Sequence, residues 1–146
     1  MISEAYESFT ELIELIPLIR EKVRKGMELD GKAHEHDIKR LKIERKNLKE
    51  VLSLFHGKWT IDVIYTIMLL KNPSFNEIKR AIPELNSRTL TSRLKFLEKQ
   101  RIIIREVIST QPVRVKYSMT EFGMGIYEML LPLFFYYAIP KKLRDF

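Results

Sequence analysis

The chain has 146 residues, 45% of them hydrophobic and 31% charged, so it can build a core and is not expected to be disordered. It contains no cysteine, which excludes disulfides, thiol nucleophiles, thiol-based redox sensing and cysteine zinc sites. The net charge of +7 favours an anionic partner if the excess is concentrated in one region.

The excess is concentrated in the middle of the chain. Residues 1–56 hold 11 basic and 11 acidic side chains, residues 57–120 hold 12 and 5, and residues 121–146 hold 3 and 3. We interpret this distribution as a polyanion-binding module, residues 51–120, carried on a neutral frame. A solvated surface with a basic balance is the alternative.

The N-terminal residues predict two helices. Residues 3–25 have an apolar stripe, with Ser3 as its cap, and Pro17 should kink or divide this helix. Gly26 and residues 28–31 predict a helix end and a turn. A second helix should run to Phe55, with a charged outer face that implies no partner by itself. Because the apolar stripe needs a cover, we expect residues 1–50 to form a helical dimerisation arm.

Two histidines between these helices raise the question of a metal. His34 and His36 are two residues apart, with acidic neighbours. On a helix, side chains at this spacing point about 200° apart and do not share one ion. We therefore expect neither a metal nor a cofactor here.

The middle of the chain predicts a helix-turn-helix. Residues 58–70 are apolar nearly all round, which predicts a buried central helix with Trp59 as a core anchor. A short helix should follow over residues 74–82, and then a helix over residues 86–98 capped by Asn86. This second helix has leucines on one side and Arg88, Ser92 and Lys95 on the other. In a basic setting, the succession is typical of a DNA-reading helix-turn-helix.

Two predicted strands follow directly. Residues 101–108 are rich in β-branched side chains, and residues 113–119 alternate apolar and polar positions. A hairpin after a recognition-type helix is a wing, whose outer face would present Arg114 and Lys116, with Gln111 nearby, to the DNA backbone or an adjacent groove. The expected fold is mainly helical with a small hairpin wing, flanked by N- and C-terminal dimerisation helices.

Within residues 121–146, a last helix capped by Thr120 should run from Phe122 to about Ile139. Its apolar run contains Glu128 and Pro132, and the uninterrupted part is shorter than the roughly 20 residues that a membrane span needs. We expect a subunit interface instead of a span, since aromatic residues are enriched at interfaces.

Four motifs resemble one known family. They are Gly57-Lys-Trp-Thr60, Phe75-Asn-Glu-Ile-Lys-Arg80, Leu90-Thr-Ser-Arg-Leu94 with Leu97-Glu98, and Val113-Arg-Val-Lys-Tyr-Ser-Met-Thr-Glu-Phe-Gly123. In this order, over residues 52–135, they resemble the HxlR-type winged helix-turn-helix transcriptional regulators of the MarR-like superfamily. The resemblance implies a prokaryotic or archaeal, cytoplasmic, homodimeric DNA-binding regulator.

The chain departs from that family in three ways. The cysteine by which some members sense oxidants is missing, so thiol sensing cannot be transferred. Arg101 stands where the family has a glycine after the recognition helix, an awkward residue if that site needs a positive φ. The N-terminal helical extension is long for the family.

Together the residues and the resemblance predict a sequence-specific regulator that binds double-stranded DNA at a palindromic operator. Arg88 is the expected base contact, and Lys95, Lys99 and Lys116 the expected phosphate contacts. The full expected set is Asn86, Ser87, Arg88, Thr89, Thr91, Ser92, Lys95, Lys99, Arg114 and Lys116.

The same predicted fold also serves other functions. A winged-helix protein–protein adaptor and a sequence-tolerant chromatin-type protein are the alternatives. An enzyme is not expected, because the three histidines form no nucleophile–base pattern and no glycine-rich phosphate loop occurs. The sequence leaves open whether the terminal helices enclose a small-molecule effector.

Overall fold

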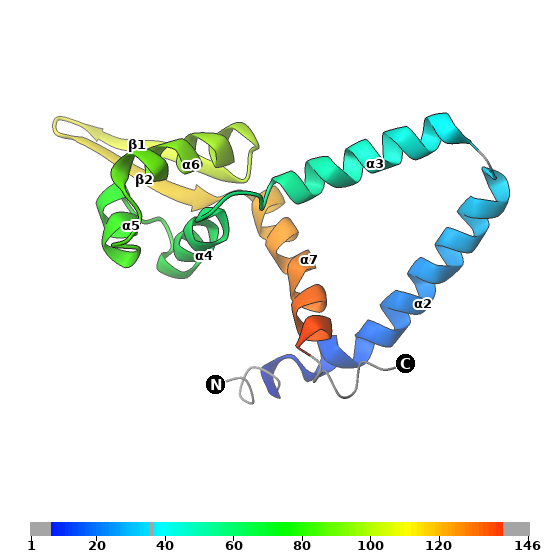
Figure 1. Cartoon of the computed structure of the whole chain (residues 1–146). Helices are drawn as coiled ribbons and strands as arrows, with labels where there is room; N and C mark the ends of the chain where they lie inside the picture. The colour runs from blue at the N-terminus through cyan, green and yellow to red at the C-terminus, as the bar shows by residue number, and fades with distance from the viewer. Residues whose placement is uncertain (1–6, 36, 139–146) are drawn as a thin grey trace. The chain divides into compact units, whose positions relative to one another are not determined.

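A computed structural model describes residues 7–35 and 37–138, which divide into two compact units (Figure 1). The first unit is Lys42–Ile126, and the second unit joins Met1–Leu41 with Tyr127–Phe146. The expected division into residues 1–50, 51–120 and 121–146 stays a prediction. The helices and strands are α2 (Thr10–Ala33), α3 (Ile38–Ser53), α4 (Thr60–Leu70), α5 (Phe75–Ala81), α6 (Ser87–Lys99), β1 (Ile103–Thr110), β2 (Val113–Met119) and α7 (Glu121–Tyr137).

The first unit confirms the predicted fold class, mainly helical with a two-stranded antiparallel hairpin. Its core side chains come from α4, α5, α6, the loop between α5 and α6, and the base of the hairpin, elements that lie together in Figure 1. Apolar side chains at helical spacing are excluded from water there, which is the main source of stability for such a small unit. The core side chains are Val63, Ile64, Ile67, Ile78, Ile82, Leu85, Leu90, Leu94, Leu97, Ile102, Ile103 and Tyr117.

Helix α4 is buried on one side only. Val63, Ile64 and Ile67 face the core, but Ile61 and Leu69 are 57% and 64% exposed. The expectation of a helix buried all round is therefore wrong, because hydrophobicity does not tell how many neighbours cover a helix. Trp59, expected as a core anchor, is half-buried and stands at the N-cap with φ 78°, and the Lys58 ammonium lies 4.9 Å from its ring centroid.

The hairpin packs on the helices only at its base. Ile103 pairs with Met119 and Arg105 with Tyr117, and a register shift falls between Val107 and Ser109. Towards the tip, the apolar side chains are more than half exposed: Val107, Ile108 and Val113. Only the base of the apolar side is covered, contrary to the expectation that the apolar side of both strands would pack on the helices.

Helix α2 runs without interruption from Thr10 to Ala33, contrary to the predicted helix end near Gly26. A glycine inside a helix costs only about 1 kcal/mol relative to alanine, so it does not stop a long helix. Pro17 lies within the helix and does not divide it. The His34 N–H donates to the Asp30 carbonyl at the C-cap. Ser3 and His36 lie outside the described residues.

The second unit holds α2 against the C-terminal part of α7. The rings of Phe9 and Phe135 are 5.0 Å apart, and the Arg20 guanidinium lies 5.0 Å from the Tyr136 ring centroid. Phe135 is the most buried of these side chains, at 3% exposure. Over residues 7–35 and 37–138, no helix is both long and apolar enough to span a bilayer.

Candidate nucleic-acid interface

The helix-turn-helix begins with a doubly capped helix. Ser74 Oγ accepts from the Glu77 N–H at 3.3 Å, and the Glu77 carboxylate accepts from the Ser74 N–H at 2.6 Å, which is a capping box. Two amides that a helix start leaves free are satisfied in this way, so a helix of only seven residues is well defined.

The second helix, α6, begins at the residue that its sequence predicts. Asn86 Oδ1 accepts from the Thr89 N–H at 2.8 Å, so the predicted N-cap is confirmed. The preceding turn is held by Leu85, which is 1% exposed and whose N–H donates to the Ile82 carbonyl. The buried Leu85 side chain thus fixes the turn between α5 and α6 to the core.

Helix α6 has one side in the core and one in solvent. Leu90, Leu94 and Leu97 are at most 2% exposed. The other side is open and presents guanidinium, ammonium and hydroxyl groups as hydrogen-bond donors. The exposed side chains of the expected set on this helix are Ser87, Arg88, Thr91, Ser92, Lys95 and Lys99.

Arg101 ends this helix in a left-handed conformation, with φ 58°. The Ile102 N–H donates to the Leu97 carbonyl and the Arg101 N–H to the Glu98 carbonyl, both at 2.9 Å. This pattern is a Schellman motif, in which glycine is the usual residue at the left-handed position. The buried pair of Ile102 and Leu97 completes it, so the motif forms although an arginine takes the place of the glycine.

The wing is fixed to the start of α5. The Tyr117 N–H donates to the Pro73 carbonyl at 2.9 Å, and Ser74 and Lys116 form an isolated bridge. The Lys116 ammonium lies 2.9 Å from Glu77 Oε2. The Ser74 N–H and then the Lys116 ammonium lower the pKa of Glu77 from 4.5 to about 2. Lys116, an expected phosphate contact, is thus ion-paired within the chain.

The wing also brings a cation that sequence reasoning missed. Arg105 lines a groove of about 410 Å³ together with Thr91 and Lys95 of α6. It also lines a second groove of about 540 Å³, with Arg114 and Lys116. Arg105 pairs with the buried Tyr117 across the hairpin, and side chains directly opposite each other lie on the same face of a sheet. This pairing could have indicated that Arg105 faces the helices.

Arg93 is the one arginine of α6 turned away from this face. It is half-buried, and a Cβ added at Gly57 would come within 2.6 Å of its Nη1. Gly57 itself has φ 106°, a conformation that glycine adopts readily. Arg93 therefore belongs to the packing between α6 and the Gly57 turn.

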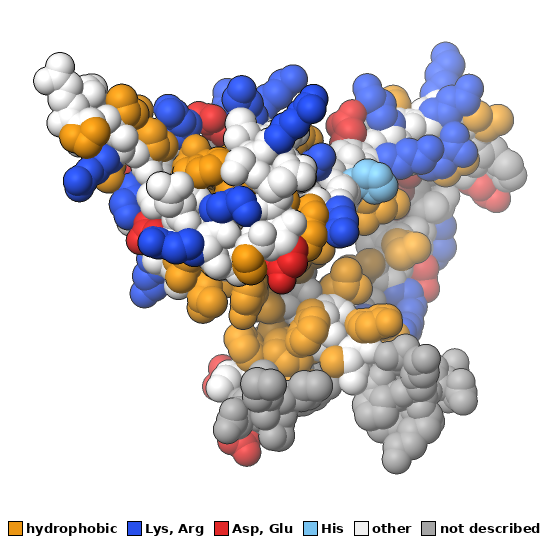
Figure 2. Space-filling view, turned by 60° about the vertical axis from the view of Figure 1, so that its left-hand side comes forward, with side chains coloured by type: hydrophobic (Ala, Val, Ile, Leu, Met, Phe, Trp, Pro, Cys, Tyr) orange, Lys and Arg blue, Asp and Glu red, His pale blue; other side chains and the backbone are white. Residues whose placement is uncertain are grey.

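The structure thus places six of the expected residues on the open side of α6. Asn86 and Thr89 are occupied in the cap, and Thr89 is half-buried, while Thr91 Oγ1 donates to the Ser87 carbonyl at 2.8 Å. Arg114 is exposed on β2. In Figure 2, Lys and Arg side chains predominate over Asp and Glu side chains on the visible face.

A capped second helix with a polar open face, followed by a hairpin fixed to the first helix, defines a winged helix-turn-helix protein. Residues 54–138 match the model of the family described as HxlR-like helix-turn-helix. The chain belongs to the HxlR-like helix-turn-helix family. This membership confirms the expected class, a DNA-binding transcription regulator, and it leaves residues 1–53 outside the match.

Relatives agree with this assignment. The uncharacterized HTH-type transcriptional regulator YdzF of Bacillus subtilis is 33% identical over 79 residues, which is 54% of this chain and 72% of YdzF. An uncharacterized HTH-type transcriptional regulator of Methanothermobacter thermautotrophicus is 40% identical over 74 residues, covering 51% of this chain and 56% of that protein. These relatives are named as regulators and not as enzymes.

Solved structures show the same fold. Diamide-treated YodB from B. subtilis matches with a TM-score of 0.56 at 28% identity, over 62% of this chain and 88% of YodB. The oxidised form of the redox regulator HypR matches with a TM-score of 0.52 at 33% identity, over 62% and 92%. The present 146 residues contain no cysteine, so thiol chemistry is not available to them.

Proposed function

We propose that the protein is a homodimeric, sequence-specific transcription regulator that binds a palindromic operator. Each subunit places α6 in a major groove, and the wing contacts the backbone or an adjacent minor groove. Two-fold symmetry then spaces the half-sites by one helical turn, about 34–36 Å. The observation that carries this proposal is the open, donor-rich side of α6 opposite a fully buried leucine stripe.

The side chains divide into base-reading and backbone-contacting groups. Arg88 lies in the second position of α6, where a guanidinium can pair with guanine through two hydrogen bonds. Lys95 and Lys99 contact phosphates, which adds affinity without sequence preference. Arg105 and Arg114 extend this contact along the wing. Lys116 serves less directly, because it holds Glu77 and so orients the wing.

Exposed apolar side chains support the dimer. In the second unit, Met129 and Leu133 of α7 are 77% and 63% exposed, one helical turn apart. Large apolar patches of this kind mark protein–protein contacts. Met129→Lys with Leu133→Lys should convert the dimer to a monomer in sedimentation equilibrium, whereas Glu128→Gln on the same helix should leave it dimeric. A monomeric native protein would contradict this part of the proposal.

Selection of bound duplexes from a random pool tests the proposal as a whole. We expect a palindromic consensus. In fluorescence anisotropy, Arg88→Ala should relax the preference at one base position, and Lys95→Ala should weaken binding to all duplexes alike and lower the salt slope by about one counterion. Lys32→Ala, an equal charge change on α2, is the control. Binding without a consensus would instead indicate the chromatin-type role.

The proposed location follows from the proposed partner. A regulator of prokaryotic or archaeal genes works in the cytoplasm, where the DNA lies. Whether the protein represses or activates depends on the operator position, and a small-molecule effector would act through the apolar surfaces of α2 and α7.

A further inference from the structure

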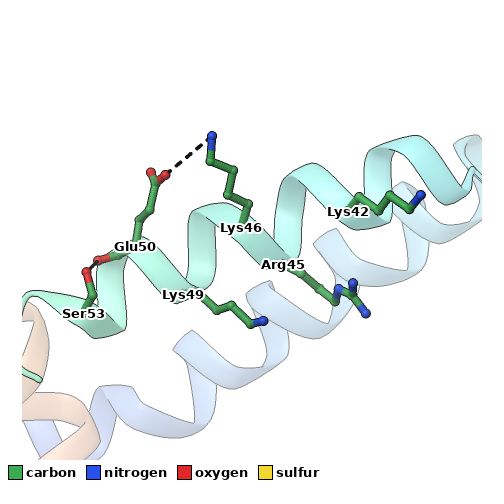
Figure 3. A pocket seen from close by; sticks show the side chains of 6 residues that line it. All are labelled: Lys42, Arg45, Lys46, Lys49, Glu50 and Ser53. Atoms are coloured by element: carbon green, nitrogen blue, oxygen red, sulfur yellow. Dashed lines mark hydrogen bonds and ion pairs between the residues drawn. The ribbon is translucent and has the colours of Figure 1, made fainter.

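Helix α3 carries a stripe of cations that the neutral total of residues 1–56 conceals. Residues 1–37 hold five basic and nine acidic side chains, whereas α3 holds six basic and two acidic ones. All of α3 is described, and none of its residues is buried. The cations Lys42, Arg45, Lys46 and Lys49 line an open depression of about 400 Å³ along the helix (Figure 3).

These four side chains share one side of the helix. At 100° per residue they fall within an arc of about 100°, and the helix rises about 10 Å from Lys42 to Lys49. Figure 3 shows Arg45 and Lys49 extending to the same side. Lys46 is paired with Glu50 at 3.8 Å, a weak and exposed ion pair. Within the described part of the chain, no ion pair is recorded for Lys42, Arg45 or Lys49.

The stripe belongs to the structural unit that contains the recognition helix. The division between the units falls at Leu41 and Lys42, so all four cations lie in the unit with α6 and the wing. This unit holds 16 basic and 8 acidic side chains, and the other unit holds 10 and 11. The apolar positions Leu41, Leu48 and Leu52 lie about 90° from the centre of the stripe, and Arg45 is the cation nearest to them. Covering these leucines therefore leaves Lys42, Lys46 and Lys49 in solvent.

We infer that the α3 stripe is a second DNA-contacting surface, which binds phosphates of the operator or its flanks in addition to the contacts of α6 and the wing. Duplex DNA carries about one negative charge per 1.7 Å of axis, so a stripe of about 10 Å faces several phosphates. The inference rests on the proposed DNA-binding function. It concerns residues outside the family match, which begins at residue 54.

The competing occupant is an acidic helix of a second copy. Helix α2 is the candidate, but its five acidic side chains are balanced by five basic ones. Lys25 pairs with Glu21 at 2.8 Å, and Asp30 pairs with Arg40 within its own unit. Four glutamates of α2 (Glu11, Glu14, Glu21 and Glu28) fall within an arc of about 100°, but Lys25 and Lys32 lie in the same arc and Lys25 pairs with Glu21. This side of α2 therefore matches four cations less well than the uniformly negative backbone of DNA, so charge complementarity favours DNA.

The test is the salt dependence of operator binding by the full chain, measured with a selected operator extended by about one helical turn on each side. The variant is Lys42→Gln with Arg45→Gln and Lys49→Gln, because glutamine keeps helix propensity and removes charge. We expect the slope of log Kd against log salt to fall by about 2 or more, at about 0.9 per phosphate contact, with an unchanged base consensus. A matched variant on α2, Lys22→Gln with Arg24→Gln and Lys32→Gln, should leave the slope unchanged.

A second variant gains affinity and so does not depend on loss of function. Glu50→Gln removes a carboxylate beside the stripe and frees Lys46, so it should tighten operator binding by about two- to fivefold at low salt. Circular dichroism and the melting temperature should stay at the native values for all three variants.

The outcomes separate the two proposals. If the α3 variant keeps the native slope while Lys95→Ala lowers it, the α3 surface is overturned and the proposed function stands. If the α3 variant raises the dimer dissociation constant and leaves the slope unchanged, a second copy occupies the stripe, which also overturns the inference. If the native protein binds no duplex, both fall.

Discussion

Glu77 and Lys116, 39 positions apart in sequence, join the first helix of the helix-turn-helix to the second strand of the wing through a contact of 2.9 Å. The same carboxylate accepts from the Ser74 N–H at the start of α5. One side chain therefore caps a helix and orients the hairpin.

This carboxylate should make stability depend on pH. Its folded pKa is lowered to about 2 from 4.5, so its contribution is present above about pH 4.5 and is lost as the pH falls towards 2. Glu77→Gln should be less stable than the native protein at pH 7, and the gap in urea midpoint should close as the pH falls through this window. A gap that stays constant from pH 7 to 2 would contradict the pairing.

Asn86 lets capping be separated from DNA contact. Asn86→Ala should cost about 1 kcal/mol of unfolding free energy, because the Thr89 N–H loses its acceptor. Asn86→Ser keeps an acceptor and should keep the stability, measured by chemical denaturation. It removes the amide nitrogen, so it should still weaken operator binding in anisotropy. If Asn86→Ser binds the operator with native affinity, the Asn86 side chain is not a DNA contact.

Arg101 offers a stabilising substitution. Its φ of 58° costs a residue with a Cβ about 1–2 kcal/mol, and glycine avoids this cost at some expense in unfolded-state entropy. We expect Arg101→Gly to raise the unfolding free energy by up to about 1 kcal/mol. Arg101→Ala removes the same charge but keeps the Cβ, so it should bring no such gain.

The two glycines of α7 should respond oppositely to alanine. A Cβ at Gly123 would lie 2.1 Å from the Ile102 carbonyl oxygen, so Gly123→Ala should destabilise the protein by about 1–3 kcal/mol. At Gly125 the described structure has nothing within 4 Å, and alanine should add about 0.5–1 kcal/mol through helix propensity. Thermal denaturation of both variants checks this, and equal effects would contradict the close contact at Ile102.

The features that sequence predicted well are those with strong local signals. The leucine spacing of α6 and the Asn86 cap depend on residues close together in the chain, and the structure confirms both. The alternation in residues 113–119 likewise predicted β2 with its observed bounds.

Other features depend on tertiary neighbours and could not be read from local patterns. The half exposure of α4 reflects which elements cover it, and the Glu77–Lys116 pair requires the hairpin to fold back onto α5. Arg93 lies beside Gly57, and this contact joins residues 36 positions apart in the sequence. The helix end predicted near Gly26 is wrong, because the small free-energy cost of one glycine does not interrupt a helix of 24 residues.

The end of α6 and the first turn of α7 pack closely together, although the hairpin separates them in sequence. Thr120 Oγ1 donates to the Arg101 carbonyl at 2.6 Å and accepts from the Gly123 N–H at 2.8 Å, while the Thr120 N–H donates to the Ile102 carbonyl at 3.0 Å. With no space for a methyl group at Gly123, the first turn of α7 cannot slide on Ile102. The first turn of α7 is therefore fixed to the end of α6, and in the proposed DNA complex a rotation of this turn would also move the end of α6.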